Sequence, residues 1–395
     1  MLLTPKAEID ARIAHLQQEL SRAGFDGAIL VQNNDLFYFT GTVQNSQLYV
    51  PARGEPVLAV RKSLARARQE SPLKNIVPLT NPKEFAAILS SCGCHPQANV
   101  GLELDVLPVN RLYDFQKLLP RIDFADVSPI VRTIRMIKSP YEIELIRETM
   151  RVLDKGFQEI PRVLHEGMLE FELACHFEAA LRREGISGSS RMRAFNQDFA
   201  MSAISSGSSG AYSSGVAGSV GGAGLTPAYP MGASRKAIRR NEVILVDFAP
   251  SVNGYTGDQT RVFCIGALDP KMVQAHQDAL FIQAEVIKLL QPGVLAEEAY
   301  FLGVKIAAEM GYSENFLGYR DDQVRFIGHG VGLDTDELPV MGPGSKIPMQ
   351  IGMTFALEPK FVFPEGAIGT ESTYVMTEQG AENLDITPLG ITYIK

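Results

Sequence analysis

The first third of the chain alternates between amphipathic stretches and short apolar runs. Residues 8–24 carry apolar side chains at helical spacing from Ile9 to Leu20, which predicts an amphipathic helix. The apolar run 27–31 predicts a short buried strand. Further strands are predicted at 36–39, 47–50 and 56–60, and further helices near 62–70 and 110–119. This pattern predicts a mixed α/β domain of ordinary size.

A domain boundary is predicted near 130–138, so we expect one domain over 1–133 and a second over 134–395. The second opens with a strong helix start. In the sequence Ser-Pro-Tyr-Glu at 139–142, Ser is the expected cap, Pro occupies the first turn and Glu completes a capping box. A second helix is predicted at 168–184, closed by a glycine.

Residues 202–224 have an unusual composition, because 15 of these 23 residues are Ser or Gly. A flexible linker is one interpretation, but the segment lies inside the second domain. It lacks the Gly-Lys-Ser/Thr sequence of a phosphate-binding loop. We favour a loop beside the mouth of an active site.

Charge and cysteine content narrow the class of protein. The net charge of −8 comes without long acidic runs, so it favours solubility and argues against a nucleic-acid partner. No stretch of 18 consecutive apolar residues indicates a membrane span. The N-terminus lacks the pattern of a secretory signal, and four scattered cysteines do not suggest a disulfide framework. We expect a cytoplasmic protein.

Two predicted hairpins in the second domain carry acidic residues on apolar strands. The run 243–249 contains Asp247, and Asp258 begins the next run after the turn signal Asn253-Gly254. A hairpin centred on this turn places Asp258 opposite residue 249. Both aspartates then point to the same face, as long as the register does not shift by one residue.

The second hairpin opposes two glutamates. A turn centred between Pro364 and Glu365 places Glu358 directly opposite Glu371. Like charges opposed in a strand pair are destabilising, and a buried carboxylate without a partner costs several kcal/mol or shifts its pKa. A cation between the two glutamates removes both problems.

His329, with a glycine on each side, lies in the same domain and completes the candidate set. Four carboxylates and one imidazole suit divalent metal ions, with Mn²⁺ or Co²⁺ expected first and Zn²⁺ or Fe²⁺ as alternatives. The formal charge of the carboxylates balances two such ions. Two ions can hold a bridging water, lower its pKa and polarise a carbonyl. The alternative is that these acids form surface salt bridges, which their apolar neighbours argue against.

The ordered set Asp247, Asp258-x-Thr260-Arg261, His329, Glu358 and Glu371 resembles the pita-bread metallohydrolases, which include creatinase, prolidase and the Xaa-Pro and methionine aminopeptidases. The resemblance extends to the N-terminal region, where 38–41 and 101–103 look like parts of a creatinase-type domain. It implies an α+β protein, with a creatinase-type α/β domain followed by a pita-bread domain that has a curved antiparallel sheet and a dinuclear metal site. It also implies a homodimer.

The resemblance assigns roles to the candidate residues. Asp247 would ligate one ion, and His329 with Glu358 the other, while Asp258 and Glu371 would bridge both. Glu358 would also transfer the proton of the attacking water. Thr260 would support the site from outside the ligand set.

The chain departs from the family pattern at three positions. The family's peptidases have histidines where this chain has Pro230 and Asp336, and its Xaa-Pro enzymes often have an arginine where this chain has Gly369. The first hypothesis is a metal-dependent Xaa-Pro aminopeptidase or dipeptidase. In it, either Asp336 pairs with the amino group of a peptide substrate or a residue of the Ser/Gly-rich segment supplies the missing donor. The second is a relative that acts on a non-peptide C–N bond or another small polar metabolite. The third is a non-catalytic binding protein.

Overall fold

The computed structural model describes residues 2–197, 201–216 and 218–395, which form two compact units, Met1–Arg135 and Met136–Lys395. None of the helices in these ranges combines the length and apolar composition that a membrane span requires.

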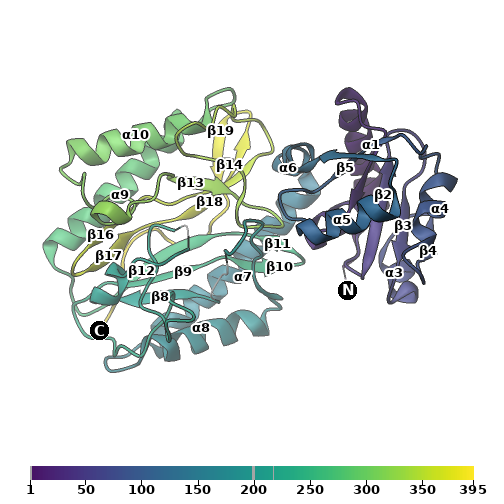
Figure 1. Ribbon diagram of the computed structural model, residues 1–395. Coiled ribbons are helices and arrows are strands. Elements are labelled where there is room, and N and C mark those ends of the chain that lie inside the picture. Colours follow the sequence, from purple (N-terminus) through teal and green to yellow (C-terminus); the bar gives the residue numbers. More distant parts are fainter. Residues whose placement is uncertain (1, 198–200, 217) are drawn as a thin grey trace. The chain divides into compact units, whose positions relative to one another are not determined.

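The N-terminal unit is built on a mixed sheet with the strand order β4-β3-β2-β1-β5-β6 (Figure 1). Strand β1 pairs antiparallel with β2 and parallel with β5, and apolar residues such as Ile29 and Val100 are fully buried. The elements of this unit are α1 (Lys6–Arg22), β1 (Gly27–Leu30), α2 (Asn33–Thr40), β2 (Ser46–Pro51), β3 (Val57–Val60), α3 (Leu64–Glu70), β4 (Ile76–Pro78), α4 (Glu84–Ser91), β5 (Asn99–Leu102), α5 (Val109–Leu118), β6 (Asp123–Asp126) and α6 (Ser128–Met136).

One predicted strand is wrong. The run 36–39 lies in helix α2, not in a strand. The Gln32 side chain caps this helix by accepting a hydrogen bond from the Asp35 backbone N–H, and Gly41 ends it with φ 76°. A run of four apolar residues is compatible with a helix or a strand, and here the residues at its two ends decide. The other predicted strands and helices of this region are present.

The C-terminal unit begins with helix α7, at the predicted start. The Ser139 side chain accepts a hydrogen bond from the Glu142 backbone N–H, and the Glu142 carboxylate accepts one from the Ser139 N–H, so the predicted capping box is confirmed. The second predicted helix is α8.

The other elements of this unit are mainly short strands. Its elements are α7 (Pro140–Val163), α8 (Glu170–Arg183), β7 (Gly188–Ser189), β8 (Ala203–Ser206), η1 (Gly207–Ala211), β9 (Ile244–Phe248), β10 (Pro250–Val252), β11 (Tyr255–Thr256), β12 (Gln259–Ile265), α9 (Pro270–Leu289), α10 (Ala296–Glu309), η2 (Arg320–Asp322), β13 (Gly328–Gly330), β14 (Glu337–Val340), β15 (Thr354–Leu357), β16 (Lys360–Phe363), β17 (Gly366–Gly369), β18 (Ser372–Thr377), β19 (Gly380–Asn383) and β20 (Thr392–Ile394).

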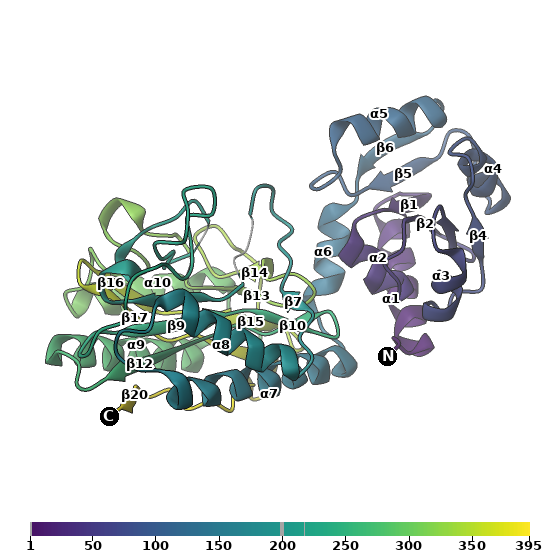
Figure 2. The same cartoon turned by 90° about the horizontal axis from the view of Figure 1, so that it is seen from below.

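These strands form mostly antiparallel sheets, of which two are central to the site. One has the order β20-β12-β9-β8 and the other β14-β13-β15-β18-β19. Helices α7, α8 and α9 lie along one side of the strands, and long loops lie on the other side (Figure 2). An isolated bridge between Thr260 and Glu371 connects the two sheets. The α+β architecture with its antiparallel sheets agrees with the predicted fold class.

Both predicted hairpin registers are confirmed. Strand β9 pairs with β12 so that Asp247 faces Thr260, which places residue 249 opposite Asp258. The Asn253-Gly254 turn has φ of 51° and 89°, as a type I′ turn requires. Strands β16 and β17 pair in the register that opposes Glu358 and Glu371, and a hydrogen bond from the Thr370 N–H to the Pro359 carbonyl continues it.

Candidate metal centre

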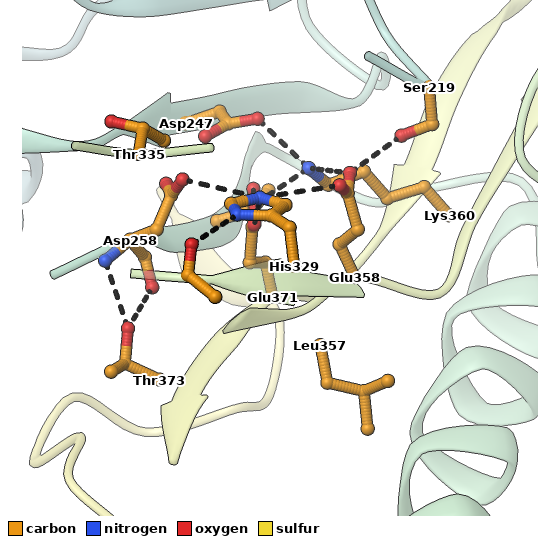
Figure 3. A network of polar contacts seen from close by, with 12 residues as sticks. Ser219, Asp247, Asp258, His329, Thr335, Leu357, Glu358, Lys360, Glu371 and Thr373 are labelled. Carbon is orange, nitrogen blue, oxygen red and sulfur yellow. Dashed lines mark hydrogen bonds and ion pairs between the residues drawn. The ribbon is translucent and has the colours of Figure 1, made fainter. Parts of the chain in front are cut away.

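The five predicted ligands converge on one side of the two sheets (Figure 3). The His329 Nε2 atom lies 3.8 Å from Asp258 Oδ2, 3.7 Å from Glu358 Oε1 and 3.9 Å from Glu371 Oε1. Asp247, on β9, joins the same group because its carboxylate and that of Glu371 both contact the Lys360 ammonium. The two hairpin registers bring the aspartates together and the glutamates together, and strand β13, which pairs with β15, brings His329 beside them.

Thr260 and Thr373 hold two of the carboxylate-bearing segments in place. The Thr260 hydroxyl donates a hydrogen bond to Glu371 Oε2 at 2.8 Å. The Thr373 hydroxyl accepts a hydrogen bond from the Asp258 N–H and donates one to the Asp258 carbonyl. The site carboxylates are therefore fixed by contacts between strands that are distant in the sequence.

Lys360 contributes a cation that the sequence analysis missed. Its Nζ atom lies 2.7 Å from Glu371 Oε2, 2.9 Å from Asp247 Oδ2 and 3.1 Å from Glu358 Oε2 (Figure 3). The Lys360 side chain is only 2% exposed. A signal was available in the sequence, because Lys360 is two residues from Glu358 and therefore points to the same face of an extended chain.

Gly369 makes room for this lysine. It pairs directly with Lys360 across the β16–β17 hairpin. A Cβ atom at position 369 would lie 3.0 Å from Lys360 Cγ and 2.5 Å from the Pro359 carbonyl oxygen. Gly369, which stands where Xaa-Pro enzymes of the family often have arginine, therefore lies directly beside Lys360.

Burial and mutual repulsion control the charges of the site. Burial raises the pKa of Asp258 well above its usual value, and the charges of Glu371 and Asp247 raise it further. Burial also raises the pKa of Asp247, although the Lys360 ammonium opposes this. For Lys360, burial lowers the pKa, but three neighbouring carboxylates outweigh that effect and leave the pKa well above its usual value. The lysine is therefore charged, and it neutralises part of the cluster.

The half of the cluster around His329 fits a single divalent ion. Asp258, His329 and Glu371 each offer one ligand atom, and these atoms lie within 4.8 Å of one another. Ligands at about 2.0–2.2 Å from an ion lie about 3–4 Å apart, which agrees with the distances measured from His329. Asp258 Oδ1 is buried and has no hydrogen-bond partner among the described residues, which is costly unless a cation faces it. The half around Asp247 already holds the Lys360 ammonium, so the full two-ion set does not fit this arrangement.

Comparison with known proteins identifies the family. The sequence profile of metallopeptidase family M24 matches residues 144–378, more than half of the chain, and that of the creatinase/prolidase N-terminal domain matches residues 12–137. The chain belongs to metallopeptidase family M24. Membership confirms the predicted pita-bread relationship, the hydrolase class and a dependence on divalent metal ions.

Relatives match over almost their entire length. The Xaa-Pro dipeptidase of Pyrococcus furiosus is 24% identical over 95% of this chain and 98% of its own. The probable dipeptidase PepE of Mycobacterium tuberculosis is 26% identical over 97% of this chain and 96% of its own.

Solved structures share the fold. The Xaa-Pro dipeptidase from Bacillus anthracis superimposes with a TM-score of 0.83 at 22% identity, covering 98% of this chain and 100% of its own. The X-Pro aminopeptidase from Thermotoga maritima gives a TM-score of 0.80 at 22% identity, covering 97% and 99%.

A pocket opens over the M24 site. Its polar floor contains the five predicted ligands and Lys360. Its walls are mainly apolar, and they include Met192, Val216, Val220, Phe326 and Val340. Residues from the Ser/Gly-rich segment 202–224 form part of one wall, in agreement with the predicted loop at the mouth of the site. The beginning of that segment is more regular than expected, because it forms β8 and η1.

Asp336 lines this pocket, and its carboxylate is already engaged. It accepts hydrogen bonds from the backbone N–H groups of Arg193 at 2.7 Å and Ala194 at 2.8 Å. Pro230 is exposed to solvent and is not among the residues that line the pocket. Of these two residues, which stand where the family's peptidases have histidine, only Asp336 faces the site.

Glu170 is a second residue that the sequence analysis missed. It begins α8, is fully buried, and accepts hydrogen bonds from the backbone N–H and hydroxyl groups of Ser206 and Ser234 and from the Ser209 hydroxyl. Ser206 and Ser209 belong to the Ser/Gly-rich segment. Further along this segment, the Ser219 hydroxyl donates a hydrogen bond to Glu358 Oε2 at 3.0 Å. Glu170 thus anchors the wall that contacts the site.

Proposed function

We propose that this M24 protein is a metal-dependent peptidase that cleaves Xaa-Pro bonds. The observation that carries the proposal is the convergence of Asp258, His329, Glu358 and Glu371 on the floor of a pocket. Relatives that match almost the whole chain are named Xaa-Pro dipeptidases. The hydrolytic site and the names of the relatives support the same reaction.

A divalent ion held by Asp258, His329 and Glu371 would supply Lewis-acid activation of water and of the scissile carbonyl. Glu358 is the proposed proton carrier. Its Oε2 atom is held by Ser219 and Lys360, while Oε1 points toward His329. This orientation leaves Oε1 to accept a proton from the attacking water and to deliver it to the leaving nitrogen.

The walls of the pocket bind the substrate in this proposal. The apolar side chains of Val216, Val220 and Phe326 exclude water and suit a pyrrolidine ring. Asp336 would pair with the amino group of the substrate, as an acceptor whose position is fixed by two backbone N–H groups. The choice between an aminopeptidase and a dipeptidase stays open in this proposal.

A second candidate is hydrolysis of a non-peptide C–N bond in a small polar metabolite. It is favoured by Asp336 and Lys360, because the first stands where peptidases of the family have histidine and the second adds a fixed positive charge beside the reacting groups. A screen of cyclic and linear amides against the metal-loaded protein distinguishes the two candidates.

The finer properties of the protein are also part of the proposal. Mn²⁺ or Co²⁺ is the proposed ion, since the ligands are carboxylates with one imidazole. Two such ions would require the Lys360 ammonium to leave its three carboxylates. A homodimer follows from the family resemblance. A cytoplasmic location is supported by the free state of Cys92, Cys94, Cys175 and Cys264.

The test is turnover of Xaa-Pro dipeptides and longer peptides by protein loaded with Mn²⁺ or Co²⁺, with Xaa-Ala peptides as the comparison. We expect cleavage at proline that EDTA abolishes. Glu358→Gln should lower kcat by about 10²–10⁴ because it removes the proton carrier. Glu365→Gln is the matched control, since Glu365 lies at the exposed tip of the same hairpin. Metal-loaded protein that cleaves no proline bond would reject the proposal.

A further inference from the structure

The glutamates at the centre of the site divide their oxygens between two positions. Oε2 of Glu358 and Oε2 of Glu371 contact the Lys360 ammonium at 3.1 and 2.7 Å. Oε1 of Glu358 and Oε1 of Glu371 point instead toward His329 Nε2, at 3.7 and 3.9 Å. The cluster thus has two cation positions, and the chain itself fills one of them.

The filled position uses the same carboxylates that a second ion would need. Lys360 is bound by Asp247, Glu358 and Glu371, and Asp247 makes no contact with His329 that would assign it to the other position. The backbone of Lys360 is also held on both sides, by the pairing with Gly369 and by a hydrogen bond from the Leu317 N–H to the Lys360 carbonyl. Movement of the side chain would break three ion pairs, of which those to Glu358 and Glu371 are almost completely buried.

We propose that the ε-ammonium of Lys360 permanently takes the place of one divalent ion, so that this M24 site binds a single ion at Asp258, His329 and Glu371. This inference rests on the proposed metal-dependent function and specifies its cofactor. In it Lys360 is a positioning residue, because it holds Asp247 and the two glutamates in place.

Charge balance agrees with one ion. When they are ionised, as metal binding requires, the four carboxylates Asp247, Asp258, Glu358 and Glu371 bring four negative charges, of which Lys360 neutralises one. One divalent ion leaves a single net negative charge. A second divalent ion beside the ammonium would make the buried cluster net positive and place like charges within about 4 Å of each other, which is unfavourable.

The experiment counts ions. Wild-type protein and variants are equilibrated with Mn²⁺, freed of excess ion by gel filtration, and analysed by mass spectrometry for bound manganese and by electron paramagnetic resonance. We expect one equivalent in the wild type, with the spectrum of an isolated Mn²⁺ ion. Lys360→Ala should bind two equivalents and give the spectrum of an exchange-coupled pair.

Lys305→Ala is the matched control, because Lys305 lies on α10 with 71% of its side chain exposed, and it should bind one equivalent. His329→Ala should lose the ion, with affinity lowered beyond the roughly 10–100-fold that loss of an outer partner causes. Asp247→Asn should retain one equivalent with less than about a threefold change in affinity, because Asp247 binds the lysine and not the ion. This variant keeps the test decisive if Lys360→Ala does not fold.

Two equivalents or none in the wild type, one equivalent in folded Lys360→Ala, or loss of the ion in Asp247→Asn would each overturn the inference. The outcome is separate from that of the proposed function. One bound ion without cleavage of Xaa-Pro peptides rejects the function and leaves the inference standing. Cleavage of Xaa-Pro peptides by wild-type protein that holds two ions supports the function and rejects the inference.

Discussion

Replacement of Glu170 tests how the wall of the pocket is held. Its Oε1 atom accepts hydrogen bonds from the Ser206 N–H at 2.7 Å, from the Ser206 hydroxyl and from Ser209, and Oε2 accepts from the Ser234 N–H at 3.0 Å and from the Ser234 hydroxyl. The hydroxyl groups can turn to other partners, but the two backbone N–H groups cannot. The effect of a substitution depends on how many of these N–H groups lose their acceptor.

Glu170→Gln keeps one oxygen, so one buried N–H faces an amide nitrogen. The expected loss is about 1–3 kcal/mol in the free energy of unfolding. Glu170→Ala removes both acceptors and leaves a cavity, so we expect a loss of at least about 2–6 kcal/mol. Loss of a negative charge at the first residue of α8 adds about 0.3–1 kcal/mol to either value.

The measurement is urea unfolding of the metal-free protein, together with hydrogen exchange of the backbone at Ser206 and Ser234. Both sites should exchange faster in the variants. Glu166→Gln is the matched control, because Glu166 is exposed in the turn before α8, and it should change stability by less than about 0.5 kcal/mol. A Glu170→Gln variant as stable as the wild type, or more destabilised than Glu170→Ala, would refute this reasoning.

Two further predictions concern buried charges. Arg261 and Asp385 form an ion pair of 2.7 Å with both side chains 2% exposed, so Arg261→Met should cost about 3–5 kcal/mol, and a double-mutant cycle with Asp385→Leu should show strong coupling. Additive single effects would contradict this. Burial lowers the pKa of His276, whose Nε2 contacts the Leu389 carbonyl, so the unfolded state takes up a proton first as the pH falls below about 6.5. Wild type should therefore lose more stability than His276→Gln between about pH 7.5 and about pH 5.5 in unfolding experiments, and equal losses would count against it.

Turn chemistry made the hairpins predictable from the sequence. Asn253-Gly254 fixes a two-residue turn, and once its centre is known the partner of every residue on both strands follows. The same counting from the turn after Pro364 opposes Glu358 and Glu371. Because side chains alternate between the two faces of a strand, the number of residues between two positions then decides whether they share a face. Local sequence therefore determines each carboxylate pair, even though the pairs lie far apart in the chain.

Contacts between distant segments could not be predicted in this way. The contacts of Glu170 with Ser206 and Ser234 depend on how α8 packs, which no turn specifies. The run 36–39 shows a second limit of sequence-based prediction, since four apolar residues fit a helix as well as a strand. Lys360 is a third case. Its side of the strand follows from its spacing from Glu358, but the repulsion between Glu358 and Glu371 can be relieved either by a bound ion or by a lysine, and the sequence does not decide between them.

The presence of Lys360 changes what the fold requires of the metal. With four carboxylates in one buried cluster and no internal cation, the folded state would depend on bound ions, because a buried charge without a partner costs several kcal/mol. The ammonium pairs with three of the four carboxylates, and Asp258 is left facing His329 with a buried oxygen that no described residue contacts by a hydrogen bond. The strands can therefore assemble around Lys360 before an ion arrives, and the demand for a divalent ion is concentrated at Asp258 and His329. In this arrangement the half of the site around Lys360 and Asp247 stabilises the fold, and the half around Asp258 and His329 is free to exchange its cation.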